Sequence, residues 1–230
     1  RDGMGTWLAV FDNDGDVAAS ISKRPNLMPI ADILDKHGDE IFGNADSVIC
    51  EIDIDKEIVK RVFKLAQKHN KKVFSVVGNM SIALERRDFM KSIDCFVCNI
   101  QEAGLLFFDD YSAKTAQEMV EILSERVIAA QIPSMIVTMG GDGAVYADMH
   151  GDKGFCPARK VNVKDTTGAG DIFGGSAVYR LLELEKPISK LTSEDLRYIA
   201  AFASTAASLS TETPGGIPSI PERETVLSRM

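Results

Sequence analysis

The sequence lacks the features that mark membrane, disulfide-bonded and nucleic-acid-binding proteins. No stretch approaches the roughly 20 consecutive apolar residues that span a bilayer, and no secretory signal pattern stands at the start. Four cysteines in 230 residues are too few and too scattered for a disulfide framework, which favours a reducing cytoplasm. Acidic residues outnumber basic ones by 34 to 26, so neither nucleic acid nor an anionic membrane is an expected partner. Any phosphate must then be held locally, by backbone N–H groups or by a metal ion.

Complete zinc and nucleotide motifs are also missing. Cys95 and Cys98 have the spacing of half a zinc knuckle, but no second pair follows, and their apolar surroundings favour a buried strand with core cysteines. No GxxxxGK[ST] segment occurs, which excludes a P-loop kinase as far as a motif can. The glycines at 168, 170 and 174 miss the GxGxxG spacing, which argues against a dinucleotide-binding dehydrogenase.

Strand-like and helix-like segments alternate along most of the chain. A hairpin is predicted from residues 6–11 and 16–21, followed by a connection between Pro25 and Pro29. The predicted strands are 47–52, 73–77, 93–98 and 135–138, with sheet-edge strands at 144–147 and around 160–163. The predicted helices are one capped by Asp55, a short one near 82–91, and those at 101–107, 115–131, 169–184 and 193–210. This pattern predicts an α/β fold, with an open, mostly parallel sheet, helices on both faces and ligands at the carboxyl ends of the strands.

The segment from Val163 to Gly175 carries the strongest chemical signal. Gly168, Ala169 and Gly170 stand where an extended segment turns into a helix, so successive N–H groups can converge on an anion. Asp171, in the first turn, could accept a proton from an attacking hydroxyl while those N–H groups hold a phosphoryl group. The same tetrapeptide alone is also compatible with a plain glycine-rich turn in which Asp171 only complements the helix dipole.

The full string DTTGAGDIFGG, residues 165–175, resembles the C-terminal signature of the ribokinase-like (PfkB-type) family of carbohydrate and nucleoside kinases. Three further segments occur in the order of that family. Asn99-Ile100-Gln101-Glu102 resembles its NxxE motif, and Thr138 to Gly143 resembles its nucleotide-contacting turn. Thr213 to Ser219, which we call the closing loop, resembles the loop after the last large helix.

The resemblance implies an ATP-dependent kinase that phosphorylates a hydroxyl of a small sugar or nucleoside, with pseudouridine as one named acceptor. It implies that Asp171 is the general base and that Gly168, Ala169 and Gly170 stabilise the transition state. Asn99 and Glu102 would organise Mg²⁺ and the phosphates, Glu102 through water, because Mg²⁺ gives up its waters reluctantly. Thr138, Gly140, Gly143 and Ser204 would line the ATP site. Many relatives also bind a monovalent cation such as K⁺, and the matching positions here are Asp165, Thr167, Ser210, Thr213, Gly215 and Ser219.

Two of these motifs have a plain structural interpretation as well. Asn99 ends a predicted strand and Glu102 opens a helix, so helix capping explains both as well as metal chemistry does. The segment Thr138 to Gly143 alone could be a tight turn between strands. A non-catalytic nucleotide-binding regulatory protein of the same fold is the alternative function, although the presence of Asp171 argues against it.

The start of the chain departs from the family pattern. It begins Arg1-Asp2-Gly3, without Met, and the first βαβ unit of the family is not present in it. We therefore expect partial β lid strands at 1–24 and an α/β kinase core at 25–230, with the N-terminal part and most of the acceptor pocket absent. A homodimer through the lid strands is the assembly that this arrangement suggests.

Overall fold

The computed structural model describes residues 4–11, 17–52, 54–77, 87–187 and 190–230. Its centre is a six-stranded sheet in the order β3-β4-β5-β6-β7-β8. The strands are β3 (Ser47–Glu51), β4 (Lys72–Val76), β5 (Cys95–Asn99), β6 (Ser134–Thr138), β7 (Ala144–Asp148) and β8 (Lys153–Cys156). Strands β3 to β6 are parallel to one another, while β7 and β8 each run antiparallel to the preceding strand. The predicted α/β sheet is confirmed.

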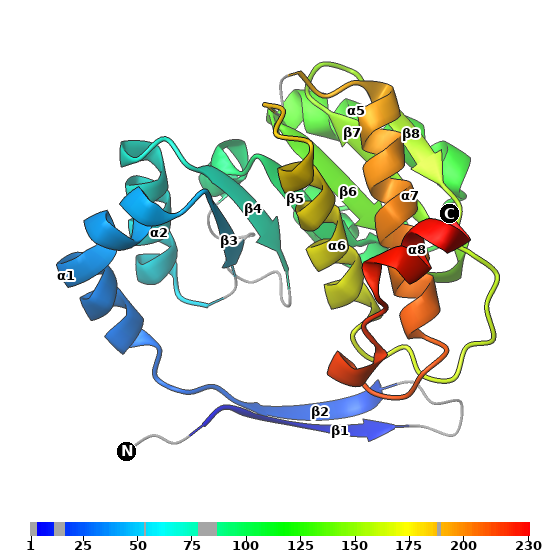
Figure 1. Ribbon diagram of the computed structural model, residues 1–230, viewed down its shortest axis with the longest axis horizontal. Coiled ribbons are helices and arrows are strands. Elements are labelled where there is room, and N and C mark those ends of the chain that lie inside the picture. Colours follow the sequence, from blue (N-terminus) through cyan, green and yellow to red (C-terminus); the bar gives the residue numbers. More distant parts are fainter. Residues whose placement is uncertain (1–3, 12–16, 53, 78–86, 188–189) are drawn as a thin grey trace.

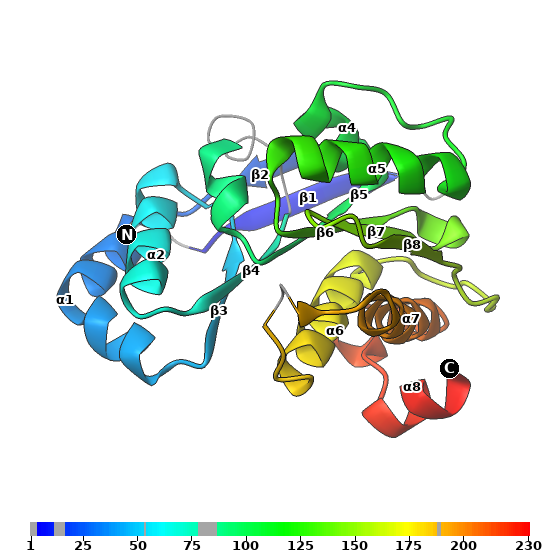
Figure 2. The ribbon, with the colours of Figure 1, turned by 90° about the horizontal axis from the view of Figure 1, so that it is seen from above.

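Helices cover both faces of this sheet (Figures 1 and 2). One face carries α1 (Met28–Asn44), α2 (Lys56–Lys68), α4 (Ile100–Phe107) and α5 (Ala116–Ala130). The other carries α6 (Ala169–Glu183) and α7 (Ser193–Ser210), with α8 (Arg223–Arg229) packed outside them. Short 3-10 turns occupy Arg87–Ser92, Gly140–Asp142 and Ile217–Ser219.

Alternation along the strands divides the core into two layers. Phe96 and Cys98 of β5 belong to the layer under α2 and α5, whereas Cys95 and Val97 belong to the layer under α6 and α7. Cys95 and Cys98 therefore point to opposite faces of the sheet, so they cannot ligate one metal ion. All four cysteines are buried and free, and burial raises the pKa of the Cys95 thiol to about 11. The predicted buried strand is confirmed.

Local capping signals fix the helix starts. The Asp55 carboxylate accepts the Glu57 N–H at 2.8 Å, and Thr115 and Thr192 each begin a helix with a reciprocal capping box. These bonds satisfy amides that a helix cannot pair internally. Three of the predicted starts are thus confirmed, and α6 and α7 end within one residue of the predicted bounds.

The predicted hairpin is also present, as β1 (Thr6–Phe11) and β2 (Val17–Lys23) paired antiparallel. It lies across the carboxyl ends of the parallel strands, apart from the helices that cover the sheet (Figure 1). Its side chains Trp7, Leu8, Val10 and Ile21 are all exposed. The turn between its strands lies outside the described residues.

Several predicted elements were wrong or incomplete. Residues 160–163 form no strand, because the chain leaves the sheet at Pro157, after β8. Strand β7 is not an edge strand, since β8 pairs with its free side. The connection predicted to end at Pro29 instead leads into α1, whose first turn contains Pro29. Proline is tolerated there because the backbone N–H that it lacks would have no partner within the helix. Of the helix expected near 82–91, residues 82–86 lie outside the described residues, and the rest is a 3-10 turn.

None of the helices among the described residues combines the length and apolar character that crossing a bilayer requires.

Candidate functional site

Two of the predicted motifs meet at the carboxyl ends of neighbouring strands. Asn99, the last residue of β5, pairs in register with Thr138, the last residue of β6. The Thr138 hydroxyl also donates to the Cys98 carbonyl at 3.4 Å. The parallel register therefore brings together motifs that lie about 40 residues apart in the sequence.

Asn99 and Glu102 form a capping box at the start of α4. The Asn99 side chain accepts the Glu102 N–H at 2.8 Å, and a Glu102 carboxylate oxygen accepts the Asn99 N–H at 2.7 Å. The capping interpretation is thus confirmed. Partial burial raises the pKa of Glu102, the bond from the Asn99 amide opposes this, and the charge of Glu51 raises the pKa further. A cation close to Glu51 and Glu102 would relieve that repulsion.

The turn before α6 exposes backbone donors. Gly168 is the N-cap, in the left-handed conformation with φ 78°, and a Cβ there would lie 3.2 Å from the Cα of Gly216. The Ala169 N–H already donates to the Thr166 carbonyl at 3.1 Å. Among the residues that the structure describes, the amides of Gly170 and Asp171 meet no protein acceptor. They are the donors that this helix start offers to an anion.

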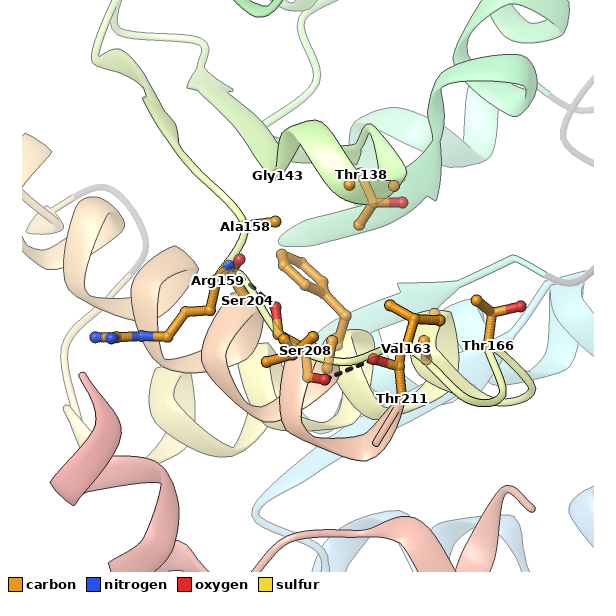
Figure 3. Close-up of a pocket in the computed structure, with 16 residues that line it drawn as sticks. Thr138, Gly143, Ala158, Arg159, Val163, Thr166, Ser204, Ser208 and Thr211 are labelled. Atoms are coloured by element: carbon orange, nitrogen blue, oxygen red, sulfur yellow. Dashed lines mark hydrogen bonds between the residues drawn. The ribbon is translucent and has the colours of Figure 1, made fainter. Parts of the chain in front are cut away.

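A cavity of about 230 Å³ opens beside these donors. Its lining combines the turn after β6, the segment after β8, the start of α6 and one face of α7 (Figure 3). The predicted residues Thr138, Gly140, Gly143, Ala169, Gly170 and Ser204 all line it. Asn99, Glu102 and Asp171 do not.

Gly143 shapes one wall of this cavity. It has φ 116° and ψ −136°, a conformation open essentially to glycine alone. A Cβ at this position would lie 2.1 Å from the Cys156 carbonyl oxygen and 2.6 Å from the Ala158 nitrogen. Glycine therefore lets the turn after β6 touch the backbone that leaves β8.

Among the described residues, Arg159 is the only Lys or Arg that lines this cavity, and its side chain does not point into it. The Arg159 side chain extends away from Thr138 and Thr166 (Figure 3), and its guanidinium donates to the Thr205 hydroxyl and the Met230 carbonyl. Its backbone N–H donates to the Ser208 hydroxyl at 3.2 Å. The cavity itself is thus largely uncharged, which suits the uncharged base and ribose of a nucleotide better than its phosphates.

A second cavity, of about 300 Å³, lies against the same helix start. Gly168 and Asp171 line it, together with further residues of α6 and of the segment 216–220. Asp171 is exposed and stands in the first turn of α6. The two cavities therefore share one turn of backbone, with Ala169 and Gly170 on one side and Gly168 and Asp171 on the other.

The positions predicted for a monovalent cation lie in the turn before α6, at the last residue of α7 and in the closing loop. The Asp165 carboxylate accepts the Thr167 N–H at 2.9 Å and the Gly215 N–H at 2.7 Å. The Gly215 amide, then the hydroxyl and amide of Thr167, hold the pKa of Asp165 below its usual value.

Other positions predicted for the cation are held by backbone and hydroxyl bonds. The Thr213 N–H donates to the Ser210 carbonyl at 3.2 Å. The buried Ser210 and Ser219 hydroxyls donate to carbonyls of Ala207 and Gly216, which leaves their oxygen lone pairs free to bind a cation. Within the described residues, no group of three or more His, Cys, Asp or Glu side chains could hold a metal ion.

Sequence reasoning missed much of the cavity lining. The segment 157–163 was expected to hold a strand but instead borders the cavity through Ala158, Arg159 and two valines. On α7 and at its C-cap, the missed residues are Ala207, Ser208 and Thr211, which follow Ser204 at spacings of three, four and seven. That run of small and polar residues on one face of a mostly buried helix was the available signal.

A family model described as pfkB family carbohydrate kinase matches residues 8–223. The chain is 34% identical to the guanosine-inosine kinase of Exiguobacterium acetylicum, over 80% of this chain and 60% of that protein. It is 28% identical to a ribokinase of Arabidopsis thaliana, over 97% of this chain and 56% of the relative. It is also 27% identical to the pseudouridine kinase of Escherichia coli K12, over 72% of this chain and 51% of that protein. The chain thus spans less than two thirds of the length of these curated relatives.

Solved structures show the same fold. The ribokinase from Giardia lamblia superposes with a TM-score of 0.85 at 18% identity, over 98% of this chain and 72% of that one. Arabidopsis thaliana ribokinase complexed with ribose and ATP gives a TM-score of 0.77 at 24% identity, over 97% of this chain and 68% of that one.

Proposed function

The chain belongs to the pfkB family of carbohydrate kinases, and we propose that the protein carrying it transfers the terminal phosphoryl group of ATP to a hydroxyl of a small sugar or nucleoside. One observation carries the proposal. The start of α6 separates two cavities, so a nucleotide in one and an acceptor in the other would meet at its free amides. Phosphoryl transfer needs mainly this positioning, together with charge stabilisation and one base.

Each group at this turn then has a chemical role. The acceptor hydroxyl attacks the terminal phosphorus, a new O–P bond forms, and the bond from that phosphorus to the bridging oxygen of ATP breaks. The hydroxyl proton passes to the Asp171 carboxylate, whose exposure beside the second cavity makes it accessible to the acceptor. The amides of Gly170 and Asp171 donate to the phosphoryl oxygens, while Gly168 keeps the turn open through its left-handed conformation.

The cations of the proposal fit the donors that are present. Asn99 and Glu102 offer the oxygen ligands that Mg²⁺ prefers, and when bound, Mg²⁺ would neutralise phosphate charge. A K⁺ ion would be held by oxygens of Asp165, Thr167, Ser210, Thr213, Gly215 and Ser219, partly of the backbone. The hydroxyl arrangement at Ser210 and Ser219 supports this part of the proposal.

The hairpin would close over the acceptor as a lid. Its position across the carboxyl ends of the strands supports this role, and its exposed apolar side chains support a homodimer through the lid strands (Figure 1). Sedimentation of the full-length protein with and without Trp7→Ser tests the dimer: the variant is expected to shift toward monomer.

A panel of sugars and nucleosides, including ribose, guanosine, inosine and pseudouridine, tests the activity. ADP release is measured for the full-length protein with Mg²⁺, in the presence and absence of K⁺. We expect turnover with one acceptor class, dependent on Mg²⁺. ATP binding with no turnover across the whole panel would instead favour a non-catalytic nucleotide-binding protein.

A further inference from the structure

The chain that leaves β8, residues 157–163, forms one wall of the cavity of about 230 Å³, and we call it the wall segment. Neighbouring elements hold its first residues. The Ser204 hydroxyl of α7 donates to the Pro157 carbonyl at 3.3 Å, and the Ala158 N–H donates to the Asp142 carbonyl at 3.4 Å. Ala158 and Arg159 both line the cavity, so these contacts decide where its wall lies.

Arg159 ties the wall segment to the elements behind it. Its N–H donates to the Ser208 hydroxyl at 3.2 Å, and its Nε donates to the Thr205 hydroxyl at 3.3 Å. The Thr205 hydroxyl can accept this bond because its own hydrogen goes to the Ala201 carbonyl, at 2.8 Å. A terminal nitrogen of the guanidinium donates to the Met230 carbonyl, just after α8. Since a guanidinium holds its donors in a fixed plane, one side chain joins α7 to the end of α8.

Helix α8 in turn rests on α6 and α7. Val226 is 1% exposed and packs in one cluster with Ile172 of α6 and with two residues of α7. Ile172 follows Asp171 in the sequence and lines the second cavity. The Val226 carbonyl also accepts the Met230 N–H at 3.1 Å. One short helix therefore reaches from the residue next to Asp171 to the residue that holds Arg159.

This arrangement gives Arg159 a role in the geometry of the cavity. Its side chain extends away from Thr138 and Thr166, so the guanidinium does not face a ligand between them (Figure 3). We propose that Arg159 is a positioning residue, which braces the wall segment against α7 and α8. The inference rests on the proposed function, in which this cavity holds ATP. Because coupling between two sites is reciprocal, a nucleotide in the cavity then also steadies α8.

A purely structural role for Arg159 would give a different result. Lost bonds alone would lower Tm, but the affinity of the folded protein for ATP and the response of α8 to a nucleotide would stay the same. The brace requires both to change with one substitution.

Hydrogen exchange of peptides covering residues 157–163 and 222–230 tests the brace in the full-length protein, with and without ADP and Mg²⁺. Arg159→Ala removes both side-chain bonds, whereas Arg159→Lys keeps the charge but replaces the planar fork with one ammonium group. We expect Arg159→Ala to exchange the amides of the wall segment about tenfold faster without nucleotide, and to lose the protection that ADP gives to α8. Arg159→Lys should lie between Arg159→Ala and the wild type in both respects.

Arg223→Ala is the matched control. Its guanidinium donates to the Glu183 carboxylate at 3.1 Å, so the variant removes an Arg contact from the opposite end of α8. Arg223 lines neither cavity. We expect faster exchange of residues 222–230 in this variant, with wild-type exchange of the wall segment and a wild-type KM for ATP.

Steady-state kinetics supply the functional readout. We expect Arg159→Ala to raise the KM for ATP about tenfold with a smaller change in kcat, because the turn before α6 is untouched. Wild-type exchange of the wall segment in Arg159→Ala would overturn the brace, as would a KM for ATP no higher than in Arg223→Ala. An α8 that ADP does not protect in a wild-type protein that binds ADP would overturn the coupling. If the wild-type protein neither binds nucleotide nor turns over, the proposed function fails, while exchange of the wall segment without nucleotide still decides the brace.

Discussion

Replacing Gly143 with alanine would test how the cavity proposed for the nucleotide is built. Gly143 lies between the turn Gly140–Asp142 and β7, and its carbonyl accepts the Met139 N–H at 2.8 Å. Its φ of 116° is strained for any other residue. The added Cβ would meet the Cys156 carbonyl oxygen at 2.1 Å and two further backbone atoms within 2.8 Å, none of which is a flexible side chain.

Two costs add for this substitution. Holding a residue with a side chain in such a conformation costs about 1–3 kcal/mol, and forcing a methyl group into packed structure costs about as much again. The sum, about 2–6 kcal/mol, is a large share of the roughly 5–15 kcal/mol by which domains are stable. A loss of about 3 kcal/mol in the free energy of unfolding would lower the Tm of a chain of this size by about 6–12 °C relative to the wild type. The chain can relax only by separating the turn from β8, which deforms the cavity wall.

Thermal unfolding and calorimetric ATP binding measure these effects. Gly141→Ala is the matched control, because its φ lies outside the left-handed region and its Cβ would meet nothing within 4 Å. We expect Gly143→Ala to lower both Tm and ATP affinity, and Gly141→Ala to change Tm by less than about 2 °C. Because Gly141 also lines the cavity, it serves as the control for Tm alone. An equal Tm in the two variants, or wild-type ATP affinity in Gly143→Ala, would refute the reasoning.

Three further predictions concern single side chains. Asp171→Asn should reduce turnover about a hundredfold to ten-thousandfold while ATP still binds, as measured by ADP release and calorimetry; near-normal turnover would remove its assignment as the base. Asn99→Ala should lower the free energy of unfolding by about 1 kcal/mol, because the helix cap is lost. Glu102→Gln keeps a capping oxygen and should instead raise the Mg²⁺ concentration needed for activity; an equal loss of Tm in both variants would contradict these separate roles. Asp94 accepts the Val73 N–H at 2.8 Å, and burial raises its pKa above the ordinary 3.8, so stability should fall as pH rises from about 4 through the folded-state pKa. Asp94→Asn keeps an acceptor and removes the ionisation, so its urea midpoint should be higher at neutral pH and should vary less with pH. An unchanged dependence of the midpoint on pH would show that Asp94 is not the group responsible.

Short-range signals predicted most of the fold. Capping residues such as Asp55, Thr115 and Thr192 bond to amides two or three positions away, so the sequence next to a helix start contains the whole interaction. Interpretation failed where a partner lay far along the chain. Whether β7 is an edge strand depends on its pairing with β8. Whether residues 160–163 form a strand depends on contacts of this segment with α7, including the bond from the Arg159 N–H to the Ser208 hydroxyl.

The candidate site divides in the same way. The motifs at 99–102, 138–143, 165–171 and 213–219 could be found in the sequence, because phosphate chemistry needs particular residues at short spacing. The sequence by itself therefore determined the family resemblance and the residues of the turn that we propose as the anion hole. Only the tertiary structure decided that this turn separates two cavities, that Arg159 points away from one of them, and that Asp165 holds Gly215. Those facts depend on hydrogen bonds and packing between segments 50 or more residues apart, which no local pattern specifies.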